Sequence, residues 1–328
     1  ITVSDAGQIS YKGQPIKNFY IEGLDLMKGR YGIATNNIDP NSISTIEVLE
    51  NHQDIKALKD LKPEERASIN LKLKSGVKGV FNLIATLGGG YVDKLLWDNE
   101  LITTYFQRNS QLLATYKGNN SGTDLESELR SHTDYDYSRT STISDIAMPA
   151  TPGINKRYYY FNQSHSATYN QVFRVGKNGE LGINAAYLND RDERSNQSVT
   201  TTLLPDGSKN VVDESFNGIL HRNIANGNIT YMQNTERNYI KEQLKFDWLS
   251  TDGYSNIYAG EDIIQENNVE NYRLHNLFHL TSRTGSDKGV EFLSKINLEK
   301  KPHSLSVAPN LFPDVIMSEQ MFQSAERR

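Results

Sequence analysis

The residues of this chain that could perform chemistry are few and far apart. His275 and His279 are four positions apart, which on a helix is the spacing of a metal-binding pair. Apolar and polar residues alternate around them, however, and in a strand such positions are roughly 13 Å apart. We therefore interpret both histidines as polar residues on the wet face of a strand. Asp124 and Glu126, and the charged run 190–194, offer oxygen ligands suited to calcium, with a solvated charged surface as the alternative.

Tyrosines gather in one segment of the chain. Tyr135 and Tyr137 precede an aromatic cluster at 158–161. Such rings either form the aromatic girdle where a membrane barrel leaves the bilayer or contact a substrate such as a sugar, a peptide or a chelate. We assign part of the cluster to a girdle and take Tyr135, Tyr137 and Tyr159 as candidate ligand contacts.

The composition excludes several classes of protein. The chain of 328 residues has no cysteine, which rules out a disulfide scaffold, a zinc-thiolate site and a cysteine nucleophile. Its formal net charge of −5 does not fit a basic nucleic-acid-binding protein. Neither a nucleophile elbow nor a paired-carboxylate motif occurs, so the sequence predicts no enzyme. No apolar run reaches the roughly 18 to 20 residues of a transmembrane helix, a test that does not apply to membrane-crossing strands.

The first 75 or so residues predict a small α+β module. Short strand-like pieces occur at 9–11 and 18–21, and 42–49 reads as an extended stretch. Apolar residues in 53–61 follow helical spacing, whereas 67–74 alternates between apolar and polar residues.

From Gly79 onward, alternation with a period of two dominates the chain. In 290–299, for example, Val290 and Phe292 face one way while Glu291 and Lys295 face the other. Each such segment has one apolar face and one polar face. We expect strands near 79–90, 98–107, 110–118, 164–176, 180–194, 236–249, 254–262, 270–282 and 288–299.

The connections between these strands alternate in length. Tight turns are expected at 108–110, 177–179, 251–253 and 284–287, whereas 119–163 and 195–235 are very long. Short turns at one end and long loops at the other are typical of an outer-membrane barrel. A soluble antiparallel β-sandwich, which also has one buried and one wet face, is the alternative.

Three motifs in order resemble the plug domain of TonB-dependent outer-membrane transporters. The strand Ile46-Glu47-Val48-Leu49 follows Pro40, and the strand 67–74 is followed by Gly76. Upstream, Ile21-Glu22-Gly23 occupies the place of the "vDG" strand of the plug. The version of these motifs here looks most like members from the Bacteroidetes. Two departures stand out: 50–52 replaces the usual Gly-Pro after the first strand, and Ala67-Ser68 replaces a Gly-Gly before the second.

The resemblance implies an α+β plug remnant at 1–77, the C-terminal part of that domain, followed at 78–328 by antiparallel transmembrane β-barrel strands. The family's barrel has 22 strands, whereas about nine are expected here. The chain begins at Ile1 without a signal peptide, and it lacks a TonB box and a terminal aromatic strand. We therefore expect a fragment or one half of a split transporter, whose remaining barrel segment comes from elsewhere in the protein or from a second chain.

The resemblance also implies a function and partners. It predicts active uptake of a scarce nutrient (glycan, peptide, siderophore or vitamin) across a bacterial outer membrane, energised by the TonB-ExbB-ExbD complex. Outer-membrane lipid and a surface lipoprotein are the other expected partners, and no cofactor is expected apart from calcium. Arg30 and Tyr31 lie where an apical loop of the plug would face the extracellular cavity, which adds them to the candidate ligand contacts. The alternatives are a soluble or surface-attached β-sandwich that binds glycans in adhesion and a passive porin-like channel.

Overall fold

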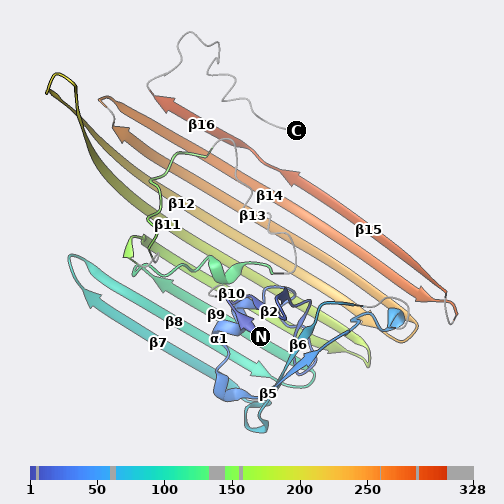
Figure 1. Cartoon of the computed structure of the whole chain (residues 1–328). Coiled ribbons are helices and arrows are strands. Elements are labelled where there is room, and N and C mark those ends of the chain that lie inside the picture. The colour runs from blue at the N-terminus through green and yellow to red at the C-terminus, as the bar shows by residue number, and fades with distance from the viewer. Residues whose placement is uncertain are drawn as a thin grey trace.

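The structure is a computed structural model that describes residues 1–4, 7–59, 64–132, 145–154, 158–258, 260–285 and 288–308. Antiparallel strands dominate it (Figure 1). Within those ranges the one α-helix is α1 (Gly32–Asn37), joined by single 3-10 turns at Pro40–Ser42, Lys56–Leu58, Ser75–Val77 and Ser127–Leu129. No helix in the described part of the chain is long and apolar enough to cross a membrane.

One large antiparallel sheet holds most of the chain (Figure 1). Its strands follow one another in chain order from one edge to the other. They are β7 (Phe81–Tyr91), β8 (Leu95–Phe106), β9 (Ser110–Asn119), β10 (Phe161–Val175), β11 (Gly179–Leu203), β12 (Lys209–Asn234), β13 (Asn238–Tyr258), β14 (Asp262–Arg283) and β15 (Gly289–Lys300). The short β16 (His303–Ala308) pairs with β14 beyond β15, so both lie along the same edge of β14.

The expected strands are confirmed at both ends of the sheet, whereas two predicted connections between its middle strands are wrong. The expected long loop 195–235 is wrong, because β11 and β12 pair without a break from Gly179 opposite Gln233 to Leu203 opposite Lys209. Residues 195–203 and 209–214 of this hairpin are exposed on both faces, so no apolar alternation marks that part of the strands.

The tight turn expected at 251–253 is also wrong, because β13 runs straight through it. Gly253 serves a different purpose there. A Cβ at this position would lie 2.7 Å from Cδ1 of Ile146, so glycine lets the segment after β9 approach the strand closely.

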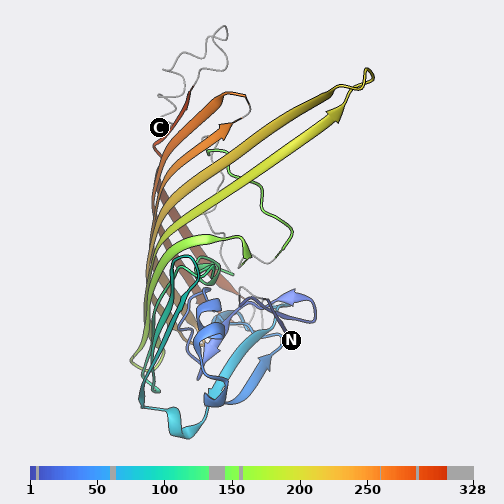
Figure 2. The same ribbon diagram turned by 90° about the vertical axis from the view of Figure 1, so that its left-hand side faces the viewer.

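Residues 1–77 form a small module on one face of the large sheet (Figure 2). One three-stranded sheet consists of β1 (Thr2–Val3), β2 (Ile9–Tyr11) and β3 (Gln14–Pro15), and the other of β4 (Phe19–Ile21), β6 (Ser68–Leu73) and β5 (Ile43–Leu49). β4 and β6 are parallel, and β5 pairs antiparallel with β6. The expected strands of this region are confirmed, whereas the helical pattern at 53–61 corresponds to one 3-10 turn among its described residues.

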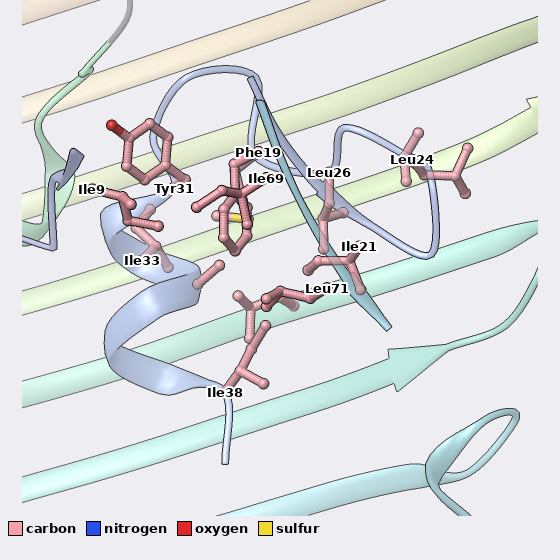
Figure 3. Packing of buried hydrophobic residues seen from close by; sticks show 14 of the residues in the cluster. Ile9, Phe19, Ile21, Leu24, Leu26, Tyr31, Ile33, Ile38, Ile69 and Leu71 are labelled. Carbon is pink, nitrogen blue, oxygen red and sulfur yellow. The ribbon is translucent and has the colours of Figure 1, made fainter. Parts of the chain in front are cut away.

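The module and the sheet share one apolar core (Figure 3). Ile21, Leu24 and Ile69 of the module are almost completely buried, and they cluster with Leu113 and Val172 from the large sheet. Burial of these side chains holds the module against the sheet. We call the sheet face that carries the module the inner face and the opposite one the outer face.

The two faces of the large sheet have the reverse of the usual polarity. On β10 the inward residues Ser164, Ser166 and Thr168 are buried, while the outward Tyr169 is 41% exposed. A soluble antiparallel sheet normally packs its apolar face on the core and leaves its polar face wet. Here large apolar side chains stand exposed along the outer face from β7 to β15. They include Leu83, Leu101, Tyr116, Tyr187, Ile229, Leu244, Phe246, Tyr272, Leu274, Phe292, Ile296 and Leu298.

Candidate ligand site between the module and the large sheet

Buried hydrogen bonds fix one loop of the module, residues 21–30, against the inner face. The side-chain amide of Gln111 on β9 donates to the backbone carbonyl of Ile21 at 2.8 Å. The amide of Asn184 on β11 donates to the carbonyl of Leu26, also at 2.8 Å. These bonds satisfy backbone groups that the turns of the loop leave without partners in a sheet.

A second contact to the same loop comes from the segment between β9 and β10. The backbone N–H of His132 donates to the carbonyl of Gly29 at 3.0 Å. Glu128 accepts from Lys117 of β9 at 2.8 Å. The long connection expected at 119–163 is confirmed between β9 and β10, and its residues up to 132 fold back over the inner face against the module.

These contacts enclose a cavity of about 350 Å³. The loop at 27–30 and the 3-10 turn at 127–129 close one side, and the inner faces of β11 to β15 close the other. Its charged described residues are mostly cationic. The basic residues of its lining are Lys28, Arg30, Lys241, Lys245, Arg273 and Lys295, and the acidic ones are Glu126 and Asp247.

The two acids of the cavity are engaged with neighbours. Glu126 forms an ion pair with Arg222 at 2.7 Å, and Arg222 also pairs with Asp190 at 2.6 Å. Asp247 accepts a hydrogen bond from the amide of Asn226 at 2.6 Å. Cations of the cavity are engaged as well, as in the ion pair of Arg273 with Glu299.

A second cavity of about 400 Å³ lies on the side of the tight turns, between the module and the ends of β10 to β13. Lys28 and Lys241 line both cavities, so they stand at the boundary between them. Lys28 is held there between Asp25 at 3.8 Å and Glu180 at 3.9 Å.

Titratable groups of the module meet in this second cavity. Burial opposes the charge on Lys17, but hydrogen bonds to Asp54 and Glu64 outweigh it and raise the pKa of Lys17. Burial lowers the pKa of the His52 imidazole, and nearby Lys17 lowers it further against the opposing pull of Asp54. The ring of His52 meets Tyr20 edge-on, with 5.7 Å between the ring centroids.

The candidate ligand contacts lie in different surroundings in the structure. Arg30 lines the first cavity. Tyr31 is only 1% exposed, and its ring packs on Phe19 in the core, so contact with a ligand would require the ring to leave that core. Tyr159 is half-buried beside the end of the sheet. Tyr135 and Tyr137 lie outside the described residues.

The cations on β13 and β15 were missing from the sequence-based candidates. Lys245 and Lys295 were recognised only as members of the polar faces of their strands, because the sequence does not indicate which strands lie near the module. His275 also lines the cavity, while His279 pairs with Glu291 at 2.8 Å. Their assignment to the wet face of a strand is confirmed.

The calcium site stays a prediction. Of the acids proposed for it, Asp190 accepts from Tyr160, Ser164 and Arg222, and Asp192 pairs with Arg194 at 2.5 Å. Among the described residues no group of three or more His, Asp or Glu side chains is arranged to hold a metal ion.

Comparison with solved structures finds weak likenesses. BauA, the ferric preacinetobactin receptor from Acinetobacter baumannii, matches over 92% of this chain and 54% of its own, with 10% identity and a TM-score of 0.30. The copper transporter OprC matches over 92% and 55%, with 10% identity and a TM-score of 0.22. The open form of Fiu, the ferric-catecholate import receptor from E. coli K12, matches over 92% and 61%, with 9% identity and a TM-score of 0.19.

The chain thus spans little more than half the length of the first two of these structures. No protein-family model matches the sequence, and the comparison with curated proteins finds no match. At such identities and TM-scores, a functional conclusion has to rest on the geometry of the chain itself.

Proposed function

We propose that this chain is part of a TonB-dependent importer of the bacterial outer membrane. In this proposal residues 1–77 are the C-terminal part of its plug and residues 78–328 are the N-terminal part of a 22-stranded transmembrane barrel. The observation that carries the proposal is the reversed polarity of the large sheet, whose polar inner face holds the module while its apolar outer face stands uncovered among the described residues. Lipid is the solvent in which such an outer face is stable.

The register of the strands supports a membrane belt. On β13 the outward residues from Ile240 to Trp248 span roughly 26 Å along the strand, which at a tilt of about 40° covers roughly 20 Å of the about 25 Å apolar band of such barrels. Glu242 interrupts the belt on this strand, where it bonds to the outward Asn276 of β14. The next two outward side chains of β13 after Glu242, Leu244 and Phe246, are 43% and 44% exposed.

An aromatic girdle borders this belt on the side of the long connections. The paired positions Tyr116, Ala167, Tyr187, Ala225, Trp248 and Tyr272 form one outward row across β9 to β14. The three tyrosine hydroxyls of this row all bond toward polar residues: Tyr116 to His165, Tyr187 to Asn223 and Tyr272 to Glu270, at 2.9, 2.9 and 2.7 Å. Rings that face the apolar rows and hydroxyls that face polar ones are what a membrane interface selects.

A soluble β-sandwich does not fit this arrangement. A sandwich buries the apolar face of one sheet against a second sheet, whereas both small sheets of the described chain belong to the module on the polar face. The edges β7 and β15 carry backbone groups that would need partners within a membrane. The remaining barrel segment, or a second chain, would supply these partners.

The proposed mechanism is active transport rather than catalysis. Besides the shared apolar core, the module meets the large sheet through polar side chains such as Gln111 and Asn184, whose hydrogen bonds water can replace when the module moves. The TonB-ExbB-ExbD complex would supply the pull, and a surface lipoprotein would assist capture of the ligand. This polar contact favours an importer over a passive porin-like channel, because a permanently open channel needs no movable module.

The proposal is tested in cells with a cysteine at Leu26, which is completely buried between the module and the wall. The protein has no native cysteine to interfere. We expect the variant in the outer-membrane fraction, labelled by a membrane-impermeant maleimide in energised cells and protected in cells without TonB or treated with a protonophore. Recovery in the soluble fraction would support the sandwich, and equal labelling with and without TonB would contradict an energised plug.

A further inference from the structure

We propose that the four tight turns at one end of the large sheet form a cationic rim that binds the phosphate groups of anionic phospholipids. These turns join β8 to β9, β10 to β11, β12 to β13 and β14 to β15. Each contributes one exposed basic residue, and these residues are Arg108, Lys177, Arg237 and Lys288. That the rim lies at a membrane rests on the proposed function above, whereas its preference for anionic lipid goes beyond that function.

The turns lie next to one another along one end of the sheet (Figure 1). Each of the middle two accepts a backbone hydrogen bond from the strand beyond its hairpin. The carbonyl of Asn178 accepts from the N–H of Asn234 at 2.9 Å. The carbonyl of Arg237 accepts from the N–H of Arg283 at 2.8 Å. Because successive turns are two strands apart, their cations are separated by roughly 10 Å or more, which suits the separate headgroups of a lipid surface.

The apolar outer face extends up to these turns. The exposed outward Val175 lies two residues before Lys177, and the exposed outward Val290 lies two residues after Lys288. Two strand residues span about 7 Å, which at a tilt of about 40° corresponds to roughly 5 Å along the membrane normal. The polar headgroup region extends about 5 to 8 Å beyond the hydrocarbon on each side of a bilayer. The cations therefore lie at the depth of the lipid phosphates.

The four basic side chains have no ion pair with any residue in the described part of the chain. Glu236 is the one acid among the described residues of these turns. Lys177 also lines the second cavity, whereas the other three cations line neither cavity. A long basic side chain beside an apolar surface can extend its charged end to the headgroups while its stem stays on that surface.

The opposite end of the outer face carries acids. Beyond the aromatic girdle, Asp252 of β13 and the two acids Glu266 and Glu270 of β14 face outward. Arg191 of β11 is an outward cation there, but it pairs with Glu193 at 3.2 Å. Anionic headgroups attract basic residues close to the membrane surface and repel acidic ones. The outer face thus favours anionic lipid in the leaflet at the tight turns, which in such barrels is the periplasmic one.

The test is reversible unfolding of the protein from two kinds of vesicle. One consists of phosphatidylcholine, and the other of equal parts of phosphatidylcholine and phosphatidylglycerol. We define the lipid effect as the factor by which the second kind raises the ratio of folded to unfolded protein. Each cation that contacts anionic lipid should contribute about fivefold to this factor, which corresponds to about 1 kcal/mol.

Variants locate the rim. Arg237→Gln and Lys288→Gln should each reduce the lipid effect about fivefold and leave stability in phosphatidylcholine unchanged. Lys209→Gln, at an exposed position near the tip of the β11–β12 hairpin, removes the same charge from the unfolded chain and should keep the full lipid effect. Arg237→Lys keeps the charge and should restore the effect. Equal lipid effects in the protein and both turn variants, or an equal loss in Lys209→Gln, would overturn the proposal.

Inorganic phosphate distinguishes lipid from a soluble anion. Added to phosphatidylcholine vesicles, it should stabilise the protein much less than phosphatidylglycerol does. Equal stabilisation by the two would assign the cations to a soluble anion and overturn a lipid rim.

The outcome also separates this inference from the proposed function. Insertion into both kinds of vesicle without any lipid effect would leave the transporter standing and remove the cationic rim. Failure to insert into either kind would remove both.

Discussion

Asn184 of β11 donates its side-chain amide both to the backbone carbonyl of Leu26, at 2.8 Å, and to the side chain of Asn170 on β10, at 3.0 Å. A single buried amide thereby connects the module to a row of hydrogen-bonded asparagines on the inner face of the large sheet. Asn228 of β12 continues the row with a bond of 3.3 Å to Asn184. Water can satisfy the hydrogen-bonding groups of this contact after separation, whereas the apolar core beside them would be exposed.

Replacement of Asn184 by Leu should loosen the module. The variant keeps the branched shape but leaves the Leu26 carbonyl and two neighbouring amides short of a partner, at an expected cost of about 1 to 3 kcal/mol. Limited proteolysis of the 1–77 region against denaturant measures the loss. Asn217→Leu, at an exposed outward position of β12, is the matched control. Equal protease resistance of the two variants would mean that Asn184 does not hold the module.

Replacement of Phe246 by Arg should destabilise the sheet in lipid. Its outward side chain lies in the row next to the aromatic girdle, where a cation should cost more than the about 0 to 1 kcal/mol of an interface and less than the about 2 to 4 kcal/mol of the bilayer midplane. Reversible unfolding from lipid vesicles measures the difference. Val199→Arg, on the exposed part of β11 beyond the girdle, should change little. A similar small effect of both substitutions would contradict a lipid-facing position for Phe246.

Replacement of Gly118 by Ala should disturb the stacking of Trp97 on His165. The new Cβ would lie 2.9 Å from the Trp97 ring and 3.1 Å from Nδ1 of His165, whose rings stack with centroids 5.2 Å apart. Overpacking of this kind costs about 1 to 3 kcal/mol. A shift of tryptophan emission in a Trp248→Phe background reports it. Gly89→Ala, with open space around its Cβ, should leave the emission unchanged.

The docking of the module should weaken as the pH falls below 6.5. The pKa of His52 is lowered in the folded protein by burial and by Lys17, so folding favours the neutral imidazole. The resulting stability is complete above the ordinary pKa of 6.5 and is lost as the pH falls through the lower folded pKa.

His52→Gln should flatten this dependence. The measurement is the temperature at which the module becomes accessible to protease, at pH 8 and at pH 5. The pKa of Glu64 is also lowered, because its bond from Lys17 outweighs burial, but its contribution disappears only below its ordinary 4.5. An identical pH dependence in the variant would exclude His52 as the cause.

The sequence predicted the sheet where one face carries apolar side chains and the other carries polar ones. In 290–299 and 270–282 that contrast produces a clean alternation; β15 lies where it was expected, whereas β14 begins at Asp262, before its expected start. At 195–203 and 209–214 both faces of β11 and β12 are exposed, so alternation is not required there and this part of a paired hairpin reads as a loop. Gly253 misled the turn prediction because close packing and turns both require glycine.

The candidate site was predictable only in part. Arg30 was found through its place in a motif, whereas Lys245 and Lys295 come together across β13 to β15 through pairing that no local pattern encodes. Tyr31 shows the opposite error, a predicted ligand contact that the structure places in the core. A tyrosine in a loop reads as a ligand contact, but here its ring fills the core beside Phe19.

The orientation of β13 tests the central claim most directly. Spin labels at single cysteines, introduced in turn at Gln243, Leu244, Lys245 and Phe246 of the cysteine-free protein, report collisions with oxygen dissolved in lipid and with a water-soluble nickel chelate. We predict that labels at Leu244 and Phe246 respond to oxygen and those at Gln243 and Lys245 do not. Outward labels that are shielded from oxygen, or that respond mainly to the nickel chelate, would contradict a membrane wall.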